Sequence, residues 1–304
     1  MWRTIRCALF CGILLGCEPI QLAAQETNTT PSKALLRTDN LVAWCIVPFD
    51  AKKRSPAERS EMLKRLGLKK VAYDWRAEHV EQFETEIQAY QTHGIDFFAF
   101  WDEHDAMFRL FEQYDLHPQV WKMLPQPSGE LLSKLAAAND QATRKQTHLE
   151  IVEATAKAIL PLVQRTREMQ CALGLYNHGG WAGEPANMAA VCQWLHQNAN
   201  AQHVGIVYNF HHGHAHIQDF QQHWAVMQPY ILCVNINGMN RNEQPKILPV
   251  GQGEFEQAMF DIIRRSGYVG PIGILDHQET VDAEESLRQN LEGIKKLAPH
   301  SETE

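Results

Sequence analysis

Eight short apolar segments that alternate with helix-period segments constrain the fold of this chain more than any other sequence feature. Several are nearly continuous runs of β-forming residues, as in parallel strands that are covered on both faces. Eight strands that are each followed by a helix predict an α/β fold with one domain, a (β/α)8 TIM barrel; a doubly wound sheet is the alternative. We expect strands at Leu41–Val47, Lys70–Tyr73, Asp96–Phe100, Gln119–Met123, Ala172–Tyr176, Val204–Tyr208, Ile231–Ile236 and Ile272–Leu275.

The segments between these strands carry helix signals. Ser55, Pro56 and Glu58 form a capping box at a helix start, and Gly67 provides the stop. The longer connection over 124–146 predicts a small extra helix at Glu130–Ala138 beside the barrel mouth. A later helix, bent at Pro161, is expected to bury a stripe formed by Leu149, Val152, Ala156, Ile159 and Val163.

The first 24 residues predict an export signal. Arg3 and Arg6 precede a ten-residue apolar run, which is too short to span a bilayer but suits a signal peptide. Residues 14–17 resemble a bacterial lipobox, so lipid anchoring at Cys17 is the alternative to free secretion. We therefore expect an exported, periplasmic protein with a polar tether over 25–39, a barrel over 40–298 and a tail over 299–304.

The charge and cysteine content of the chain limit its possible partners and disulfides. The chain has 28 Lys+Arg against 36 Asp+Glu, a formal charge of −8, so a nucleic-acid partner is disfavoured. The four cysteines after the leader (Cys45, Cys171, Cys192, Cys233) show no CxxC or CxxH spacing and are expected as core residues rather than disulfides. The oligomeric state cannot be derived from the sequence.

Polar and aromatic side chains gather directly after the predicted strands. In a TIM barrel the loops after the strands converge on one mouth, where active sites lie. Aromatic faces stack on sugar C–H surfaces, while amides, carboxylates and guanidinium groups bind hydroxyls. The mouth therefore predicts a small-molecule carbohydrate site, although any one of these residues could instead cap a helix or the barrel. The predicted substrate-binding residues are Asp74, Arg76, Trp101, Trp181, Asn209, His211, Asn235, Asn237 and Arg241.

Histidine is the second functional signal. The chain has 15 His, and six of them lie between residues 203 and 223. An imidazole has a pKa near ambient pH, so it can serve as general acid or base.

Four motifs together resemble the xylose isomerase-like TIM barrels. They are YNHGGW at 176–181, YNFHHGH at 208–214, NINGM at 235–239 and GYVGPIG at 267–273. This superfamily covers sugar isomerases, sugar epimerases and apurinic endonucleases, and the resemblance runs over about residues 40–297. More narrowly, the chain is similar to exported sugar phosphate isomerase/epimerase-like proteins of environmental bacteria. An endonuclease is disfavoured by the negative net charge, by the predicted export signal and by the absence of the metal-binding acids described next.

The resemblance also implies a metal site, from which this chain departs. The family's isomerases bind a divalent metal through Glu, Asp, His and Glu at four strand ends, and here those places hold Tyr176, Asn209, Asn235 and Leu275. None is a carboxylate or an imidazole, so we expect no metal cofactor at the usual site. A rebuilt site for a zinc-type ion is the alternative, with ligands drawn from His178, His212, His214 and Asp276.

Two features refine the expected chemistry. Gly251, Gln252 and Gly253 precede a helix that could hold a phosphate, but Glu254 and Glu256 in its first turn would repel one. We therefore expect a neutral sugar. The predicted reaction is proton transfer beside a carbonyl, as in sugar isomerisation or epimerisation. Elimination from a keto-glycoside and a non-catalytic carbohydrate-binding barrel are the alternatives. The catalytic residues would be His178 and His212, an acid/base pair, with His214 orienting them or binding substrate.

Overall fold

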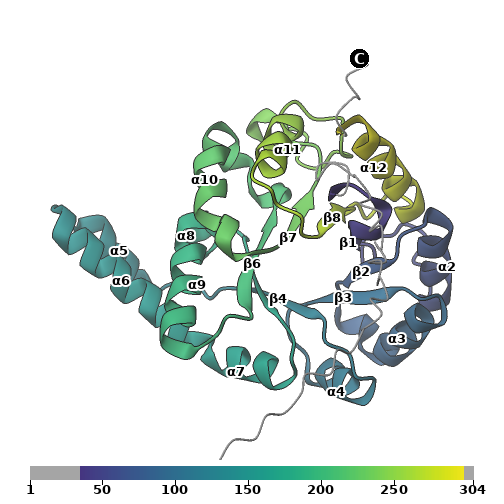
Figure 1. Cartoon of the computed structure of the whole chain (residues 1–304), viewed down its shortest axis with the longest axis horizontal. Helices are drawn as coiled ribbons and strands as arrows, with labels where there is room; N and C mark the ends of the chain where they lie inside the picture. The colour runs from purple at the N-terminus through teal and green to yellow at the C-terminus, as the bar shows by residue number, and fades with distance from the viewer. Residues whose placement is uncertain (1–34, 298–304) are drawn as a thin grey trace, which may run out of the picture.

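The computed structural model describes residues 35–297. Eight parallel strands form a closed barrel in sequence order, and β1 pairs with β8 to close it. The chain is therefore the single-domain (β/α)8 TIM barrel that the sequence predicts, with helices surrounding the strands (Figure 1). The strands are β1 (Leu41–Trp44), β2 (Lys70–Tyr73), β3 (Asp96–Trp101), β4 (Gln119–Met123), β5 (Leu173–Tyr176), β6 (Val204–Asn209), β7 (Ile231–Ile236) and β8 (Ile272–Leu275).

Helices follow the strands, and most of them surround the barrel (Figure 1). Gly67 ends α2 in the left-handed conformation (φ 73°), and the capping box at Ser55 starts it, both as predicted. The described helices are α2 (Pro56–Leu66), α3 (Phe83–Thr92), α4 (Asp105–Gln113), α5 (Gly129–Ala137), α6 (Gln141–Ala158), α7 (Leu160–Glu168), α8 (Gly180–Gly183), α9 (Pro185–Ala199), α10 (Phe220–Met227), α11 (Glu256–Arg265) and α12 (Ala283–Leu297).

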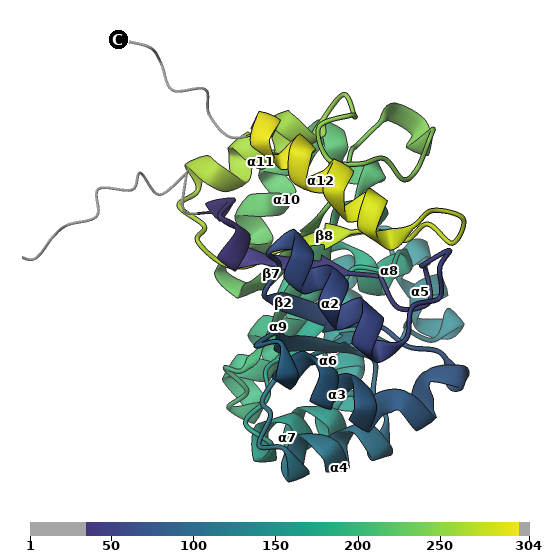
Figure 2. The same ribbon diagram turned by 90° about the vertical axis from the view of Figure 1, so that its right-hand side faces the viewer.

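The barrel also closes through its helices. The last helix, α12, lies beside α2, as Figure 2 shows. Arg65 of α2 pairs with Glu284 of α12 at 2.8 Å, and Arg54 before α2 pairs with Asp282 at 2.6 Å. These ion pairs join the two ends of the barrel sequence.

Strand bounds match the predictions to within a residue except in β1. The predicted strand Leu41–Val47 ends instead at Trp44, because Cys45 takes a positive φ of 61° that is incompatible with an extended strand. The chain therefore turns three residues early, and Cys45 becomes part of the barrel mouth.

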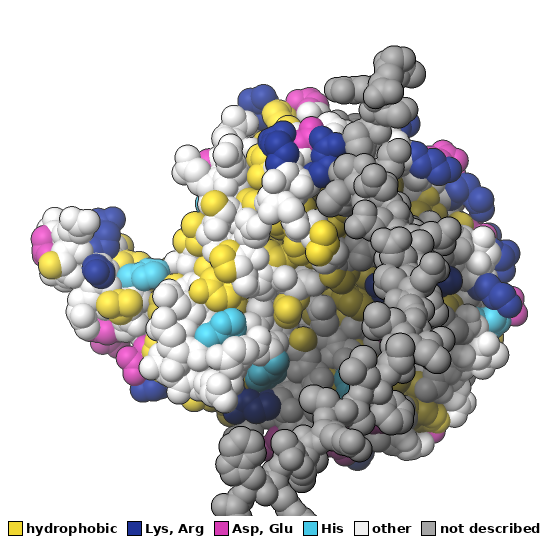
Figure 3. All heavy atoms as spheres, in the orientation of Figure 1, with side chains coloured by type: hydrophobic (Ala, Val, Ile, Leu, Met, Phe, Trp, Pro, Cys, Tyr) yellow, Lys and Arg dark blue, Asp and Glu magenta, His cyan; other side chains and the backbone are white. Residues whose placement is uncertain are grey.

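The segment after β4 differs from its prediction. Helix α5 forms nearly where expected, but it pairs with α6 in a hairpin that extends away from the ring of helices rather than beside the mouth (Figure 1). The hairpin carries charged side chains of both signs (Figure 3), including a Lys134–Glu150 ion pair at 2.6 Å. Leu149 lies on it and is 51% exposed, so its predicted burial is wrong. The helix also breaks at Ile159 rather than bending, with Pro161 in the first turn of α7.

Two layers of side chains make the core. One fills the space between sheet and helices, and the other fills the barrel, where Trp44 and Trp121 meet with ring centroids 4.9 Å apart. Gly174 permits this inner packing, since a Cβ there would lie 2.5 Å from Val207 and 3.0 Å from Trp121. The four described cysteines are buried and unpaired, as predicted.

The predicted signal peptide, the lipobox and most of the tether lie outside the described residues, as does the tail. The tether prediction overlaps the barrel at Leu35, which is 1% exposed and packs into the core. Within residues 35–297, no helix combines the length and the apolar character that crossing a membrane would require.

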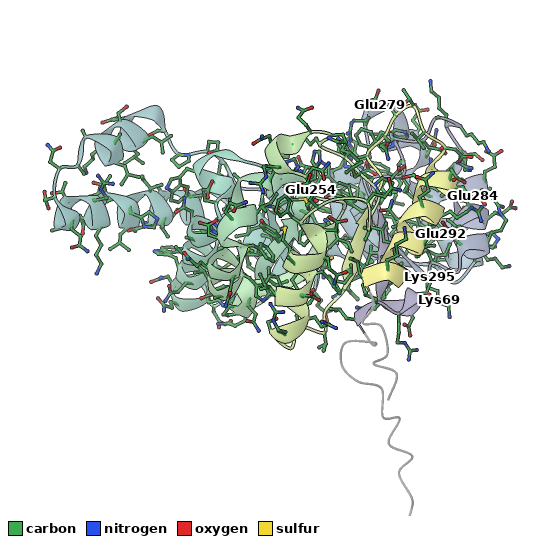
Figure 4. The ribbon with its side chains drawn as sticks, turned by 90° about the horizontal axis from the view of Figure 1, so that it is seen from above. Lys69, Glu254, Glu279, Glu284, Glu292 and Lys295 are labelled. Carbon is green, nitrogen blue, oxygen red and sulfur yellow. The ribbon has the colours of Figure 1, made fainter. Side chains whose placement is uncertain are left out.

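The two ends of the barrel are distinct (Figure 4). Glu279, in the loop after β8, lies at one end, and Lys69, which precedes β2, lies at the other. Helix α12 runs between them from Glu284 towards Lys295. The loops that follow the strands therefore share the end marked by Glu279.

Candidate active site

A cavity of about 100 Å³ opens at the mouth formed by the loops after the strands. We call it the central cavity. It is lined by Trp44, Cys45, Phe49, Asp74, Arg76, Trp101, Tyr176, His178, Asn209, His211, His212 and His277. Seven of the predicted site residues thus meet at one place: Asp74, Arg76, Trp101, His178, Asn209, His211 and His212.

Four imidazoles line the central cavity. The ring centroids of His178 and His212 lie 4.3 Å apart, and those of His211 and His277 lie 5.1 Å apart. His178 is exposed, whereas His212 is half-buried. Burial and, after it, the neighbouring imidazoles lower the pKa of His212 to about 2 and that of His211 to about 3. Both rings are therefore uncharged at neutral pH and can donate an N–H hydrogen bond to a substrate oxygen.

A buried carboxyl group faces these imidazoles across the barrel. Asp74 follows β2, which stands opposite β6 in the strand order, and it is 2% exposed. The Val47 amide donates a long hydrogen bond of 3.4 Å to its Oδ1, and within residues 35–297 its Oδ2 has no partner. Burial raises the pKa of Asp74 to about 7. This carboxyl can therefore both take up and release a proton near neutral pH.

A second carboxyl lies behind the cavity wall. Asp276 follows β8, is fully buried and does not line the central cavity. Side chains alternate along a strand, and Leu275 packs inside the barrel, so Asp276 points to the outer layer near Ser286 of α12. Burial raises the pKa of Asp276 to about 8. Burial, followed by the charges of Asp74 and Asp276, raises the pKa of the Cys45 thiol, so it is no candidate nucleophile.

Aromatic rings form much of the cavity wall. Trp101 and Tyr176 pack with centroids 4.7 Å apart, and the indole N–H of Trp44 donates to the Tyr176 hydroxyl at 3.1 Å. Phe49 packs against His277 in a tilted arrangement with ring centroids 3.9 Å apart, and the Arg76 guanidinium lies 5.2 Å from the centroid of the Phe49 ring. An aromatic wall with polar groups at its edge suits a sugar.

A ladder of amides holds the β5 and β6 loops together. The backbone N–H of Asn209 donates to Asn177 Oδ1 at 2.7 Å, and Asn177 Nδ2 donates to the backbone carbonyl of Asn209 at 3.0 Å. Asn209 Oδ1 accepts from the His211 amide at 3.1 Å, and its Nδ2 donates to the Tyr176 hydroxyl. Asn209 therefore positions the histidine-rich turn. Sequence reasoning missed Asn177, although it stands in the same motif as His178.

No protein-family model matches the chain, and no curated protein sequence matches it significantly. Solved structures do match it. A 3-keto-D-glucoside 4-epimerase from E. coli has 11% identity, a TM-score of 0.57 and coverage of 85% of this chain and 98% of that one. A D-tagatose 3-epimerase-like protein has 13% identity, a TM-score of 0.59 and coverage of 84% and 98%. A xylose isomerase-like TIM barrel protein from Mycobacterium smegmatis, in complex with magnesium, has 13% identity, a TM-score of 0.52 and coverage of 85% and 97%.

The chain has the xylose isomerase-like TIM-barrel fold. The four motifs that carry this resemblance in the sequence include the ends of β5, β6, β7 and β8. At 11–13% identity, this likeness shows the fold alone, and the reaction depends on the residues of the site.

The metal-ligand places of the xylose isomerase-like barrel do not suit a divalent ion here. The Tyr176 hydroxyl accepts from Asn209 Nδ2, and Asn209 Oδ1 accepts from the His211 backbone amide. Asn235 is buried against Gly273, and Leu275 is 2% exposed. Among residues 35–297, no group of three or more His, Cys, Asp or Glu side chains is arranged to hold a metal. The alternative ligand set of His178, His212, His214 and Asp276 is therefore not assembled in this structure.

Several predicted site residues lie away from the central cavity. His214 is buried behind it, with Nδ1 3.1 Å from the His211 carbonyl. Asn237 donates to the Gly238 carbonyl at 2.8 Å, and Arg241 is exposed over Phe255. The ring centroid of Trp181 lies 5.7 Å from that of His148, which belongs to the α5–α6 hairpin. Their predicted roles gain no support from the geometry.

Other lining residues were absent from the predicted site. They are Trp44, Cys45, Phe49, Tyr176 and His277. Trp44 and Cys45 belonged to a segment predicted as a strand, so the sequence indicated that they were core residues. His277 stands at the end of a predicted strand, and this position was the signal that could have found it.

The glycine-rich turn before α11 is already occupied by a carboxylate. Glu256 accepts from the Gly253 amide at 2.7 Å and from the Met239 amide at 3.0 Å. These backbone N–H groups are the type that would bind a phosphate. Because Glu256 is 2% exposed and engages both, the turn offers no free anion site at these amides.

Proposed function

We propose that the protein is an enzyme that acts on a neutral sugar or sugar derivative and moves a proton on a carbon beside a carbonyl group. The observation that carries this proposal is the pairing of Asp74, whose pKa lies at about 7, with uncharged imidazoles in one aromatic-walled cavity. A proton-transfer enzyme needs a group that changes protonation state near its working pH.

The residues divide the chemistry between them. Asp74 and His178 exchange protons with the substrate, and the neutral His212 donates an N–H hydrogen bond to the carbonyl oxygen. When a base takes the C–H proton, the electron pair moves into the carbonyl and forms an enediol. Protonation of the same carbon on its opposite face gives an epimer. Protonation of the former carbonyl carbon, with loss of the proton from the neighbouring hydroxyl, gives an isomer. This assignment departs from the predicted His178–His212 acid/base pair, because a pKa of about 2 makes His212 a weak base.

The names of similar structures favour the same class of substrate. They include a 3-keto-D-glucoside 4-epimerase and a D-tagatose 3-epimerase-like protein. The occupied turn at Glu256 favours a neutral sugar over a phosphorylated one. The donor set at Tyr176, Asn209, Asn235 and Leu275 offers no carboxylate, so we propose that the reaction needs no divalent metal there.

We also propose that the enzyme is exported, on the evidence of Arg3, Arg6 and the apolar run that follows them. Cell fractionation should find a processed chain outside the cytoplasm, whereas a full-length cytoplasmic chain would contradict export. Cys17→Ser should abolish membrane retention only if the lipobox is used.

Solvent exchange tests the proposed reaction. Purified protein is incubated in deuterated water with free hexoses and with methyl glycosides and their 3-keto forms. We expect deuterium to enter a sugar C–H bond beside the carbonyl, as seen by NMR. Release of methanol would instead indicate elimination from a keto-glycoside. Sugar binding without exchange or cleavage would support a non-catalytic carbohydrate-binding barrel.

A further inference from the structure

A second cavity adjoins the central one. It has a volume of about 300 Å³ and lies between the β4 loop and the β5 loop. Tyr176 and His178 line both cavities, so the two spaces meet at these side chains. We call the second space the side cavity.

The side cavity is held open by its own hydrogen bonds. Gln126 of the β4 loop donates from Nε2 to the Gly179 carbonyl at 3.0 Å and accepts at Oε1 from the Ala182 amide at 3.3 Å. Gly179 has φ 75° and ψ 176°, a conformation that favours glycine, and no atom lies within 4 Å of where its Cβ would be. The bridge fixes the distance between the loops, and the glycine leaves the space between them free.

The lining of the side cavity is mainly apolar. Met123, Leu124, Ala182 and the Tyr176 ring contribute to it, and its described lining residues include no Lys, Arg, Asp or Glu. Met123 is 37% exposed, which is unusual for a large apolar side chain in this protein. An uncharged group with an apolar or aromatic face would cover this surface.

We propose that the side cavity binds the aglycone of a neutral glycoside. The sugar ring would occupy the central cavity and the apolar aglycone the side cavity, with His178 at the junction beside the bridging oxygen. This inference rests on the proposed function, since it assumes that the sugar binds in the central cavity. It narrows the substrate class from sugars in general to glycosides with an apolar aglycone.

Matched glycosides test the inference. Binding of phenyl and methyl glycosides of D-glucose and D-galactose, in both anomers, is measured by titration calorimetry with the full chain. We expect the best phenyl glycoside to bind at least about 10-fold more tightly than its methyl counterpart. Met123→Ala should lower the phenyl affinity by about 5-fold and leave the methyl affinity unchanged. Leu149→Ala is the control, because Leu149 is also exposed but lies on the hairpin.

The outcomes separate this inference from the proposed function. Equal affinity for phenyl and methyl glycosides, or a phenyl advantage that survives Met123→Ala, would overturn the side-cavity assignment even if sugar C–H exchange occurs. A phenyl advantage that depends on Met123, without any C–H exchange, would support the side cavity and contradict the proposed reaction. Failure of every glycoside to bind would overturn the side-cavity assignment, and deuterium exchange into free hexoses would then still test the proposed reaction on its own.

Discussion

The β8–β1–β2 side of the barrel mouth differs from the β5–β6–β7 side in the groups that it buries. The first side buries two carboxyl groups, Asp74 and Asp276, whose pKa values are raised to about 7 and about 8. The second side carries Tyr176, Asn209 and Asn235, with the imidazole of His212 uncharged beside them. The carboxyl group of the central cavity thus comes from the β2 side, and most of its imidazoles come from the β5 and β6 loops.

This difference teaches that one barrel fold can present different chemical groups at equivalent strand ends. The resemblance to sugar isomerases places metal-binding acids after β5, β6 and β8, and here those positions are neutral. Asp276 stands one residue beyond Leu275, but alternation along the strand turns its side chain to the outer layer. The carboxyl that does line the cavity, Asp74, follows β2. Strand-end position therefore predicts chemistry only together with side-chain direction.

Replacement of Asp74 should have the largest effect. Asp74→Asn removes the group that changes protonation state near neutral pH, so we expect turnover to fall on the order of 1,000-fold with little change in substrate affinity. The rate of deuterium incorporation measures turnover. Asp96→Asn is the control, because Asp96 starts β3 at the opposite end of the barrel. Unchanged turnover in Asp74→Asn would indicate that the imidazoles, and not Asp74, exchange protons with the substrate.

The pH dependence sharpens the same comparison. If Asp74 is the base, it must be ionised, so kcat/KM should rise as pH increases through about 7. This ascending limb should disappear in Asp74→Asn. A wild-type profile that is flat between pH 5 and pH 8 would contradict the assignment, because Asp74 should change its protonation state within that range.

The imidazole side should give the next largest effect. His178→Asn and His212→Asn should each lower turnover by on the order of 100-fold, with binding nearly unchanged. His117→Asn, in an exposed loop before β4, should leave turnover unchanged. A loss of thermal stability in His178→Asn or His212→Asn, at unchanged specific activity, would identify that histidine as structural.

The outer carboxyl should affect stability rather than rate. Because the folded-state pKa of Asp276 is raised, folding favours its protonated form, and stability is lost as pH rises from about 4 to about 8. Asp276→Asn avoids this loss, so it should raise the free energy of unfolding at pH 8 by at least ~2 kcal/mol, with the gain vanishing towards pH 4. Denaturant unfolding at both pH values measures it, with exposed Asp115→Asn as the control. A gain of equal size at both pH values would indicate repacking instead.

Sequence reasoning predicted the fold well because each barrel unit repeats a local signal. The capping box at Ser55 and the stop at Gly67 depend only on neighbours in the chain, and both appear in the structure. The cavity depends on which face each strand-end residue takes. The left-handed turn at Cys45 and the outward direction of Asp276 arise from tertiary packing, so the pattern alone could not give them. Trp181 was predicted to bind substrate but instead packs near His148 of the α5–α6 hairpin. No local sequence signal indicates that this hairpin projects from the barrel.

We propose that proton transfer at this mouth relies on Asp74 and imidazoles instead of a divalent metal. Deuterium incorporation into a sugar C–H bond by exhaustively chelated protein, without added metal, tests it most directly. We expect most of the wild-type rate to remain, because the family's ligand places hold Tyr176, Asn209, Asn235 and Leu275. Loss of the rate with recovery on addition of Mn²⁺ or Mg²⁺ would contradict the claim. Recovery only with Zn²⁺, Fe²⁺ or Ni²⁺ would also contradict it and would point to a site rebuilt around His178, His212 and His214.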